Sequence, residues 1–229
     1  LAQQYRAYVL TKKYNPANNT GRVPVVLVGA NDGMVHAFDA RDTVHATDLG
    51  AGYLPGKELF AYVPRGVYAN LASLSSATYN ASHKYFVDGQ IVEGDVHFGG
   101  AGSWRTMAVG STGAGAKNLF ALDITDPKAF NGSKVLWDIT DAEESDLGHV
   151  LGTGIIGSVR DQNAPNTNGR WLFITGNGYQ SANNRAVLLM FDAQTGTIFK
   201  KMDTLVGSAG TPNGLGPVTP VYDGSRNIV

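Results

Sequence analysis

The stretch VPVVLVGANDGMVHAFDARD, residues 23–42, sets the pattern for the whole chain. It holds two apolar runs of about five residues on either side of an Asn31-Asp32-Gly33 turn, a strong short-range signal for a β-hairpin. The same arrangement returns at residues 105–127 (RTMAVGSTGAGAKNLFALDITDP) and at residues 169–196 (GRWLFITGNGYQSANNRAVLLMFDAQTG). The sequence therefore contains one β-rich unit three times.

Each copy has a glycine at the end of its first strand and an aspartate at the end of its second. The glycines are Gly29, Gly110 and Gly176, and the aspartates are Asp39, Asp123 and Asp192. The distance from glycine to aspartate grows from 10 to 13 to 16 residues, so the strands persist while the loop between them lengthens. Carboxylates at the end of a strand commonly accept hydrogen bonds from turn amides, which indicates a structural role for these aspartates.

Further strands flank each hairpin. A third strand is predicted after each hairpin, and a glycine stands shortly before it. These strands are ELFAYV (58–63), KVLWDI (134–139) and TIFKKM (197–202). Fourth strands are predicted at residues 85–98, 148–161 and 214–223. The latter two are crowded with glycine, as expected of an innermost strand near a narrow axis. Four antiparallel strands per unit, radially repeated, predict an all-β fold, a β-propeller with quinoprotein-like blades.

The repeats predict only part of a ring. Propellers typically have about four to eight blades, so three four-stranded units are expected to belong to a larger ring. Residues 23–229 form this partial propeller, and residues 1–22 are a lead-in segment, either a short helix or an edge strand. The chain begins without an initiator methionine or a signal peptide, which suggests a segment of a longer protein.

Helical content is expected to be small. The best helical candidate is residues 67–75, whose apolar side chains share one face. These are Val67, Tyr68, Leu71 and Leu74.

Composition narrows the classes of function. With 18 basic and 19 acidic residues the chain has no excess of positive charge that would favour binding to nucleic acid or to an anionic membrane. The absence of cysteine excludes disulfides and thiolate metal sites. No apolar run approaches the roughly 18 residues that a membrane span needs, so no membrane-spanning segment is expected.

The sequence motifs of the repeats are similar to those of a known family. The similar pieces are GANDGMVHAFDA (29–40), ELFAYVP (58–64), YFVDGQ (85–90), WRTMAVGSTGAGAKNLFALDITDP (104–127), LWDIT (136–140), DLGHV (146–150) and GNGYQS (176–181). In this order they resemble the C-terminal propeller of the type IV pilus tip-associated PilY/PilC family. The resemblance extends over nearly all of residues 23–221.

The resemblance implies a non-enzymatic protein that supports pilus assembly, twitching motility and adhesion. It implies export to the cell surface, the pilus tip, or the outer membrane and periplasm. The implied partners are pilins, minor pilins, and a host or abiotic surface. Two alternatives share the blade architecture: a quinoprotein-type dehydrogenase fragment and an outer-membrane assembly scaffold. A dehydrogenase needs a convergent set of acid, base and cofactor ligands, which the sequence does not display.

Members of the family often carry a calcium loop of alternating aspartates just after the strand that corresponds to residues 214–221. The matching stretch here is YDGSRNIV (222–229), where Asp223 is the only carboxylate and Arg226 lies three residues away. Calcium takes six to eight oxygen ligands, usually from several carboxylates. We therefore expect a plain turn and no cofactor in this segment.

Two other groups are weak candidates for a cation. Asp95 and His97 alternate on a predicted strand and so share one face. An acidic loop could also collect a cation, although charge runs are usually solvated. Its members are Asp138, Asp141, Glu143, Glu144 and Asp146.

Two long insertions are the expected contact surfaces. Residues 40–56 and 64–84 exceed the usual hairpin connection of two to five residues, and binding residues concentrate on loops carried by a rigid scaffold. The alternative is that residues 67–75 pack as a short helix over a sheet edge. The candidate contact residues of the second insertion are Tyr68, Leu71, Tyr79 and His83.

His36 is a different case. It superposes on Phe120 and Leu189 when the three strand-ending aspartates are aligned. We therefore expect it to be packed between blades.

Overall fold

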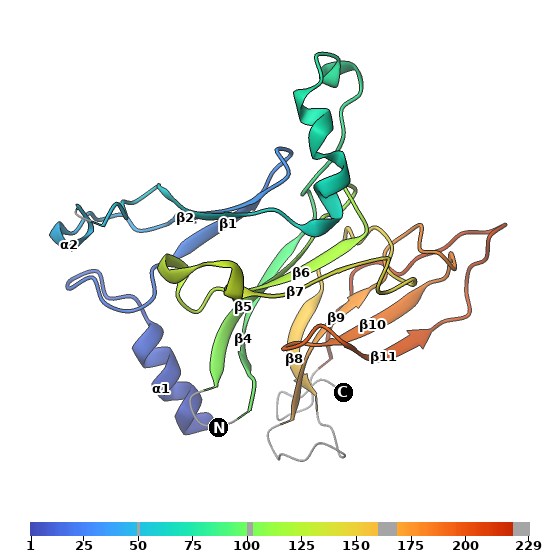
Figure 1. Ribbon diagram of the computed structural model, residues 1–229. Helices are drawn as coiled ribbons and strands as arrows, with labels where there is room; N and C mark the ends of the chain where they lie inside the picture. Colours follow the sequence, from blue (N-terminus) through green and yellow to red (C-terminus); the bar gives the residue numbers. More distant parts are fainter. Residues whose placement is uncertain (50, 100–102, 160–168, 222–229) are drawn as a thin grey trace.

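The computed structural model describes residues 1–49, 51–99, 103–159 and 169–221. Its strands form three antiparallel sheets that follow one another along the chain (Figure 1). The first sheet contains β1 (Val25–Gly29), β2 (Val35–Asp39) and β3 (Glu58–Tyr62). The second contains β4 (Ile91–His97), β5 (Trp104–Ser111), β6 (Asn118–Asp123) and β7 (Val135–Thr140). The third contains β8 (Ile155–Val159), β9 (Arg170–Gly176), β10 (Val187–Asp192) and β11 (Ile198–Asp203). The three predicted hairpins and their third strands are confirmed.

Helices are few and short in the described ranges. They are α1 (Ala2–Lys12), α2 (Ala46–Leu49) and the 3-10 helices η1 (Arg65–Ser75), η2 (Tyr79–Ala81), η3 (Pro127–Ala129) and η4 (Gly132–Lys134). The lead-in segment is therefore helical, and the predicted helix at residues 67–75 lies within η1. Within the described ranges, no helix combines the length and the hydrophobicity that crossing a bilayer requires.

The three strand-ending aspartates play the same local role. Their Oδ1 atoms accept hydrogen bonds from the amides two residues ahead, which belong to Arg41, Thr125 and Gln194, at 3.0, 2.9 and 3.0 Å. Each bond closes the turn that follows the second strand of a hairpin. The predicted structural role of Asp39, Asp123 and Asp192 is confirmed.

The repeated glycines mark places of close approach. A Cβ on Gly29 would lie 2.5 Å from the carbonyl oxygen of Val87, and one on Gly110 would lie 2.3 Å from the ring of Phe120. On Gly176 it would lie 2.1 Å from the carbonyl oxygen of Gly216. All three distances are below ordinary van der Waals contact, so none of the three positions has room for a side chain.

Two apolar cores lie between the sheets. The first joins β2 to one face of the second sheet, for example through Val35 and Phe120. The second joins the opposite face of the second sheet to the third, for example through Leu119 and Phe191. A hydrogen bond of 3.0 Å from the indole Nε1 of Trp137 to the carbonyl of Ala193 spans this second core.

Two predicted strands are corrected. The first sheet has three strands in the described ranges rather than four, because the strand predicted at residues 85–98 forms β4 and pairs with β5 of the second sheet. Residues 214–221 form no strand and make only a single bridge, between Leu215 and Gly178. Pro217 and Pro220 lack amide donors and so cannot continue a ladder. Residues 222 and 223 lie outside the described residues.

The prediction that His36 packs between blades is wrong. Its Nδ1 lies 2.6 Å from a carboxylate oxygen of Glu58 and its Nε2 lies 2.9 Å from one of Asp32, both in its own sheet. The hydrogen bond to Glu58, followed by the interactions with Asp32, outweighs burial and raises the pKa of His36. Phe120 and Leu189 are fully buried against the preceding sheet, whereas the described residues place no sheet before the first one.

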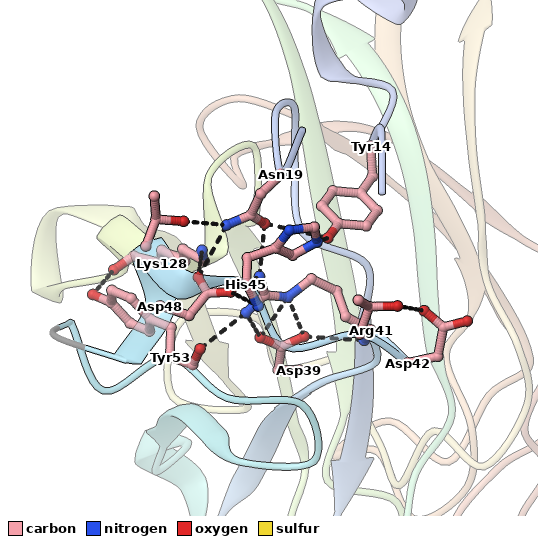
Figure 2. Close-up of polar contacts among 11 residues, drawn as sticks. Tyr14, Asn19, Asp39, Arg41, Asp42, His45, Asp48, Tyr53 and Lys128 are labelled. Atoms are coloured by element: carbon pink, nitrogen blue, oxygen red, sulfur yellow. Dashed lines mark hydrogen bonds and ion pairs between the residues drawn. The ribbon is translucent and has the colours of Figure 1, made fainter. Parts of the chain in front are cut away.

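A buried polar network fixes the first insertion, residues 40–56 (Figure 2). The side chain of Arg41 is fully buried and contacts Asp39 at 2.5 Å and Asp48 at 2.7 Å. It also donates to the side-chain oxygen of Asn19 at 2.7 Å and to the carbonyl of Tyr53 at 3.1 Å. The guanidinium thus links the lead-in, the strand-ending aspartate of the first hairpin and the insertion.

The same network reaches the second sheet. Lys128 of η3 lies 3.3 Å from Asp48, and its carbonyl accepts from the hydroxyl of Tyr53 at 3.0 Å. Burial alone would raise the pKa of Asp48, but the hydrogen bonds from Asn19 and Arg41 outweigh it and hold the pKa well below its usual range. The insertion is therefore held at its base by ion pairs, while Val44 and Leu49 remain exposed.

Replacing Gly29 with alanine is expected to lower the free energy of unfolding by about 1–3 kcal/mol, because the new methyl group must displace the backbone of Val87. Urea unfolding followed by circular dichroism measures the change. Gly132→Ala is the matched control, since a Cβ there meets nothing within 4 Å. Equal stability of the two variants would contradict the close approach described for Gly29.

Replacing Arg41 with methionine is expected to cost about 3–5 kcal/mol at neutral pH, because it removes the guanidinium that pairs with buried Asp39 and leaves buried Asp48 with Lys128 as its cation. The pKa of Asp48 is lowered in the folded state. The stabilisation is therefore present above the unfolded value of about 4 and is lost as the pH falls below it.

Urea unfolding at neutral and acidic pH tests both statements. Acidification should destabilise the unmodified chain more than Arg41→Met, and Lys57→Met, at an exposed position, should behave like the unmodified chain. The same acid sensitivity in Arg41→Met and the unmodified chain would count against the network.

Candidate functional site

The second insertion forms a projection, which we define as residues 65–85. In Figure 1 it extends beyond the sheets at the top of the view, while α1 lies at the bottom. Pro64, with φ of −63°, precedes η1, and the chain returns to the sheets at Phe86 and Val87, both essentially fully buried. The first insertion and the projection are the two surfaces that the sequence proposes for contact.

One side of the projection packs on the first core. Val67 is fully buried, and Leu71 and Leu74 pack against the apolar cluster between the first two sheets. Leu71 therefore has a packing role, because its partly buried side chain covers the core. Tyr68 is 56% exposed, so the prediction that it shares the packed face is wrong.

The base of the projection is pinned to the second sheet by polar bonds. The amide of Arg65 donates to Asp138 at 2.8 Å, and its guanidinium donates to the Asp138 carbonyl at 2.9 Å and to Glu143 at 2.7 Å. The hydroxyl of Tyr62 also donates to Asp138. Burial, followed by this bond, raises the pKa of Tyr62, so the hydroxyl keeps its proton and remains a donor at neutral pH.

A polar cavity of about 330 Å³ lies beside this base. Glu143 lines it and accepts hydrogen bonds from the amide and hydroxyl of Thr140, at 3.0 and 2.8 Å. These bonds, followed by Arg65, lower the pKa of Glu143 to about 2. The carboxylate is therefore ionised and already paired with Arg65, so it helps to hold the projection against the second sheet.

Aromatic rings cover the outer part of the projection. The ring centroids of Tyr79 and His83 lie 5.5 Å apart, and those of His83 and Tyr85 lie 5.4 Å apart. Tyr85 is 55% exposed, whereas Tyr79 is partly buried against the first core. Tyr85 was missed in the sequence because it stands directly before the buried Phe86. The exposed aromatic side chains of the projection are therefore Tyr68, His83 and Tyr85.

The acidic loop does not converge on one point, because its members bind different cations. Asp141 lies 3.5 Å from Lys117, whereas Glu144 and Asp146 lie 2.6 and 2.9 Å from Lys201. Asp138 and Glu143 bind Arg65, as described above. No group of three or more His, Asp or Glu residues suited to a metal occurs in the described ranges.

The other cation candidates are placed as follows. Asp95 accepts from Thr106 at 2.6 Å and from the hydroxyl of Tyr5 at 3.0 Å. The Nδ1 of His97 accepts from the amide of Gly99 at 3.3 Å. Asp95 and the Nδ1 of His97 thus have partners of their own, and the described residues add no third ligand to the pair. Asp223 lies outside the described residues.

Comparison with known proteins agrees with this architecture. A family model described as the PilY1 beta-propeller domain matches residues 1–227. The type IV pilus biogenesis factor PilY1 of Pseudomonas aeruginosa is 39% identical over 221 residues, covering 93% of this chain and 17% of that protein. A PilY1 homolog of Xylella fastidiosa is 38% identical over 214 residues, covering 93% of this chain and 13% of that protein.

A solved structure extends the comparison to the fold. The crystal structure of the Pseudomonas aeruginosa PilY1 C-terminal domain matches with a TM-score of 0.68 and 35% sequence identity, covering 98% of this chain and 37% of that one. The chain spans less than a fifth of the length of these curated relatives. The repeated hairpins, the radial sheets and these matches agree, and the chain belongs to the PilY1 β-propeller family.

Proposed function

We propose that this chain is a non-enzymatic contact module of a type IV pilus biogenesis factor, acting through the exposed side of the projection. Family membership supports the assignment to pilus biogenesis. The observation that carries the contact role is the geometry of the projection. One side is pinned to the second sheet through Arg65, and the other exposes Tyr68 and Tyr85.

The chemistry of the projection suits binding. Its sequence, RGVYANLASLSSATYNASHKY, is rich in tyrosine, serine and asparagine, the residues that antibody loops use for adaptable contacts. It contains no acidic residue, while Arg65 and Lys84 are basic. Lys84 donates to Asn70 at 3.0 Å, and this bond links the segment that leads back to the sheets to η1. A fixed scaffold with exposed rings loses little conformational entropy on binding.

The proposed partners are pilins and minor pilins, with a host or abiotic surface as the target of adhesion. The proposed location is the pilus tip or the cell envelope, where such partners are found. Twitching motility would follow from support of the pilus against retraction. A dehydrogenase role has less support, because the titratable groups of the described residues form local ion pairs rather than one convergent set in a cleft.

The double variant Tyr68→Ser and Tyr85→Ser is expected to reduce adhesion about fivefold or more, since exposed aromatic anchors commonly contribute over 1 kcal/mol each to binding. Stability should change by only about 0.5 kcal/mol, because both side chains are largely exposed. Surface piliation, twitching and adhesion are measured in a bacterium that expresses the full-length protein.

Two further variants separate contact from packing. Leu205→Ser alters another exposed apolar side chain, 74% accessible and outside the projection, and should leave adhesion unchanged. Val67→Ala removes a buried side chain and should lower stability. Unchanged adhesion and piliation in the double tyrosine variant would refute the contact role.

The non-enzymatic assignment makes a separate prediction. Purified protein mixed with pyrroloquinoline quinone and calcium should oxidise alcohols or sugars no faster than a protein-free control, with a dye as electron acceptor. The reason is the lack of a convergent acid and base among the described residues. Turnover well above the control would favour the dehydrogenase alternative.

A further inference from the structure

Three buried nitrogen atoms, two at one end of the second sheet and one at the start of β9 in the third, have no hydrogen-bond partner in the part of the chain that the structure describes. They are the Nε2 of His97 and the indole Nε1 atoms of Trp104 and Trp171. His97 and Trp104 are each only 6% exposed. Buried polar groups are almost always paired, so each exception needs an explanation.

The three rings form one cluster. The ring centroids of His97 and Trp104 lie 5.2 Å apart, and those of Trp104 and Trp171 lie 5.5 Å apart. Tyr5 of α1 adds a further ring, with its centroid 4.5 Å from that of Trp104. Three segments distant in sequence thus meet around one tryptophan: α1, the paired ends of β4 and β5, and the start of β9.

All three unpartnered atoms are donors. An indole Nε1–H can only donate. The Nδ1 of His97 accepts from the amide of Gly99, so in a neutral imidazole the proton is on Nε2. The site therefore lacks an acceptor, and a metal ion, which requires lone pairs, does not suit it.

Trp104 also lines a groove between α1 and β5, with a volume of about 470 Å³. This volume lies within the range of small-molecule sites. Its described lining is aromatic, polar and basic, without an acidic residue. The residues are Gln4, Ala7, Tyr8, Thr11, Lys12, Trp104, Arg105 and Thr125.

The charge of the groove favours an anion. Lys12 contributes a cation to the lining, and Arg105, also in the lining, lies 3.8 Å from the carboxylate of Asp123. Asp95, on the strand face that carries His97, already accepts from Tyr5 and Thr106. A carboxylate fits both features, because its oxygens accept hydrogen bonds and its charge complements Lys12.

We infer that this groove binds a carboxylate attached to an apolar group, with the indole N–H of Trp104 as a donor and Lys12 as the charge partner. The apolar part of the ligand packs on the rings of Tyr8 and Trp104. Either a free organic acid or the C-terminal carboxylate of a polypeptide supplies this chemistry.

Nitrogen-15 NMR of the chain tests the inference. The three tryptophans give three indole N–H signals, which single Trp→Phe variants assign. Titration with 3-phenylpropionate should shift the Trp104 and Trp171 signals saturably. The Trp137 signal should stay in place, because that indole already donates to Ala193. The uncharged 3-phenylpropionamide should bind far more weakly.

Variants locate the site. Trp104→Phe and Lys12→Gln should each weaken binding about three- to tenfold, as expected for loss of one hydrogen bond or charge partner. Lys13→Gln, at the exposed neighbouring position, is the matched control and should bind normally. Should Trp104→Phe fail to fold, Lys12→Gln still decides the matter.

A second titration, with a short peptide that ends in phenylalanine, distinguishes a free organic acid from the C-terminal carboxylate of a polypeptide. Tighter binding of the peptide than of 3-phenylpropionate supports a polypeptide terminus, and equal binding supports a free acid. Absence of a saturable shift in both indole signals, or equal binding of the amide, would overturn the inference. Normal binding by Lys12→Gln would overturn it as well.

Discussion

The arrangement depends on burial of β6 from both sides. All of its residues are buried, and alternation sends Phe120 and Leu122 to the first core and Leu119 and Ala121 to the second. A strand covered on both faces cannot alternate apolar with polar residues. This explains why NLFALD is almost continuously apolar, and it makes the second sheet the support against which the other two are placed.

Much of this architecture is local and could be predicted from the sequence. Hairpins with tight turns, strand-ending aspartates and glycine-introduced third strands depend on neighbours in the chain. The errors concern tertiary surroundings. Helical periodicity placed Tyr68 with Val67 and Leu71, but in the structure Val67 is buried and Tyr68 is exposed. This difference depends on how η1 meets the first core and not on the period of the helix. His36 occupies a repeated position, yet its sheet has no described neighbour on that side.

The two polar sites differ in how much the sequence reveals. Asp39 and Arg41 stand two residues apart, so their pairing is readable in principle, whereas Asn19, Asp48 and Lys128 join only through the fold. The donors around Trp104 come from two different sheets, since His97 and Trp104 are paired on β4 and β5 whereas Trp171 lies on β9. No spacing in the sequence predicts that they lack acceptors. The family can therefore be identified from the order of its sequence motifs, whereas the groove beside Trp104 is visible only in the folded structure.

The loops within the hairpins indicate where chains of this fold can accept inserted sequence. They occupy residues 30–34, 112–117 and 177–186, and the longest is organised by the buried Asn177, which bonds the carbonyls of Asp146 and Arg185 at 2.9 and 2.8 Å. Because the entropy cost of closing a loop grows slowly with its length, these tips can accept added sequence without disturbing the cores. A reporter peptide or small domain grafted between Ala182 and Asn183, two exposed residues of the longest loop, should leave the blades intact.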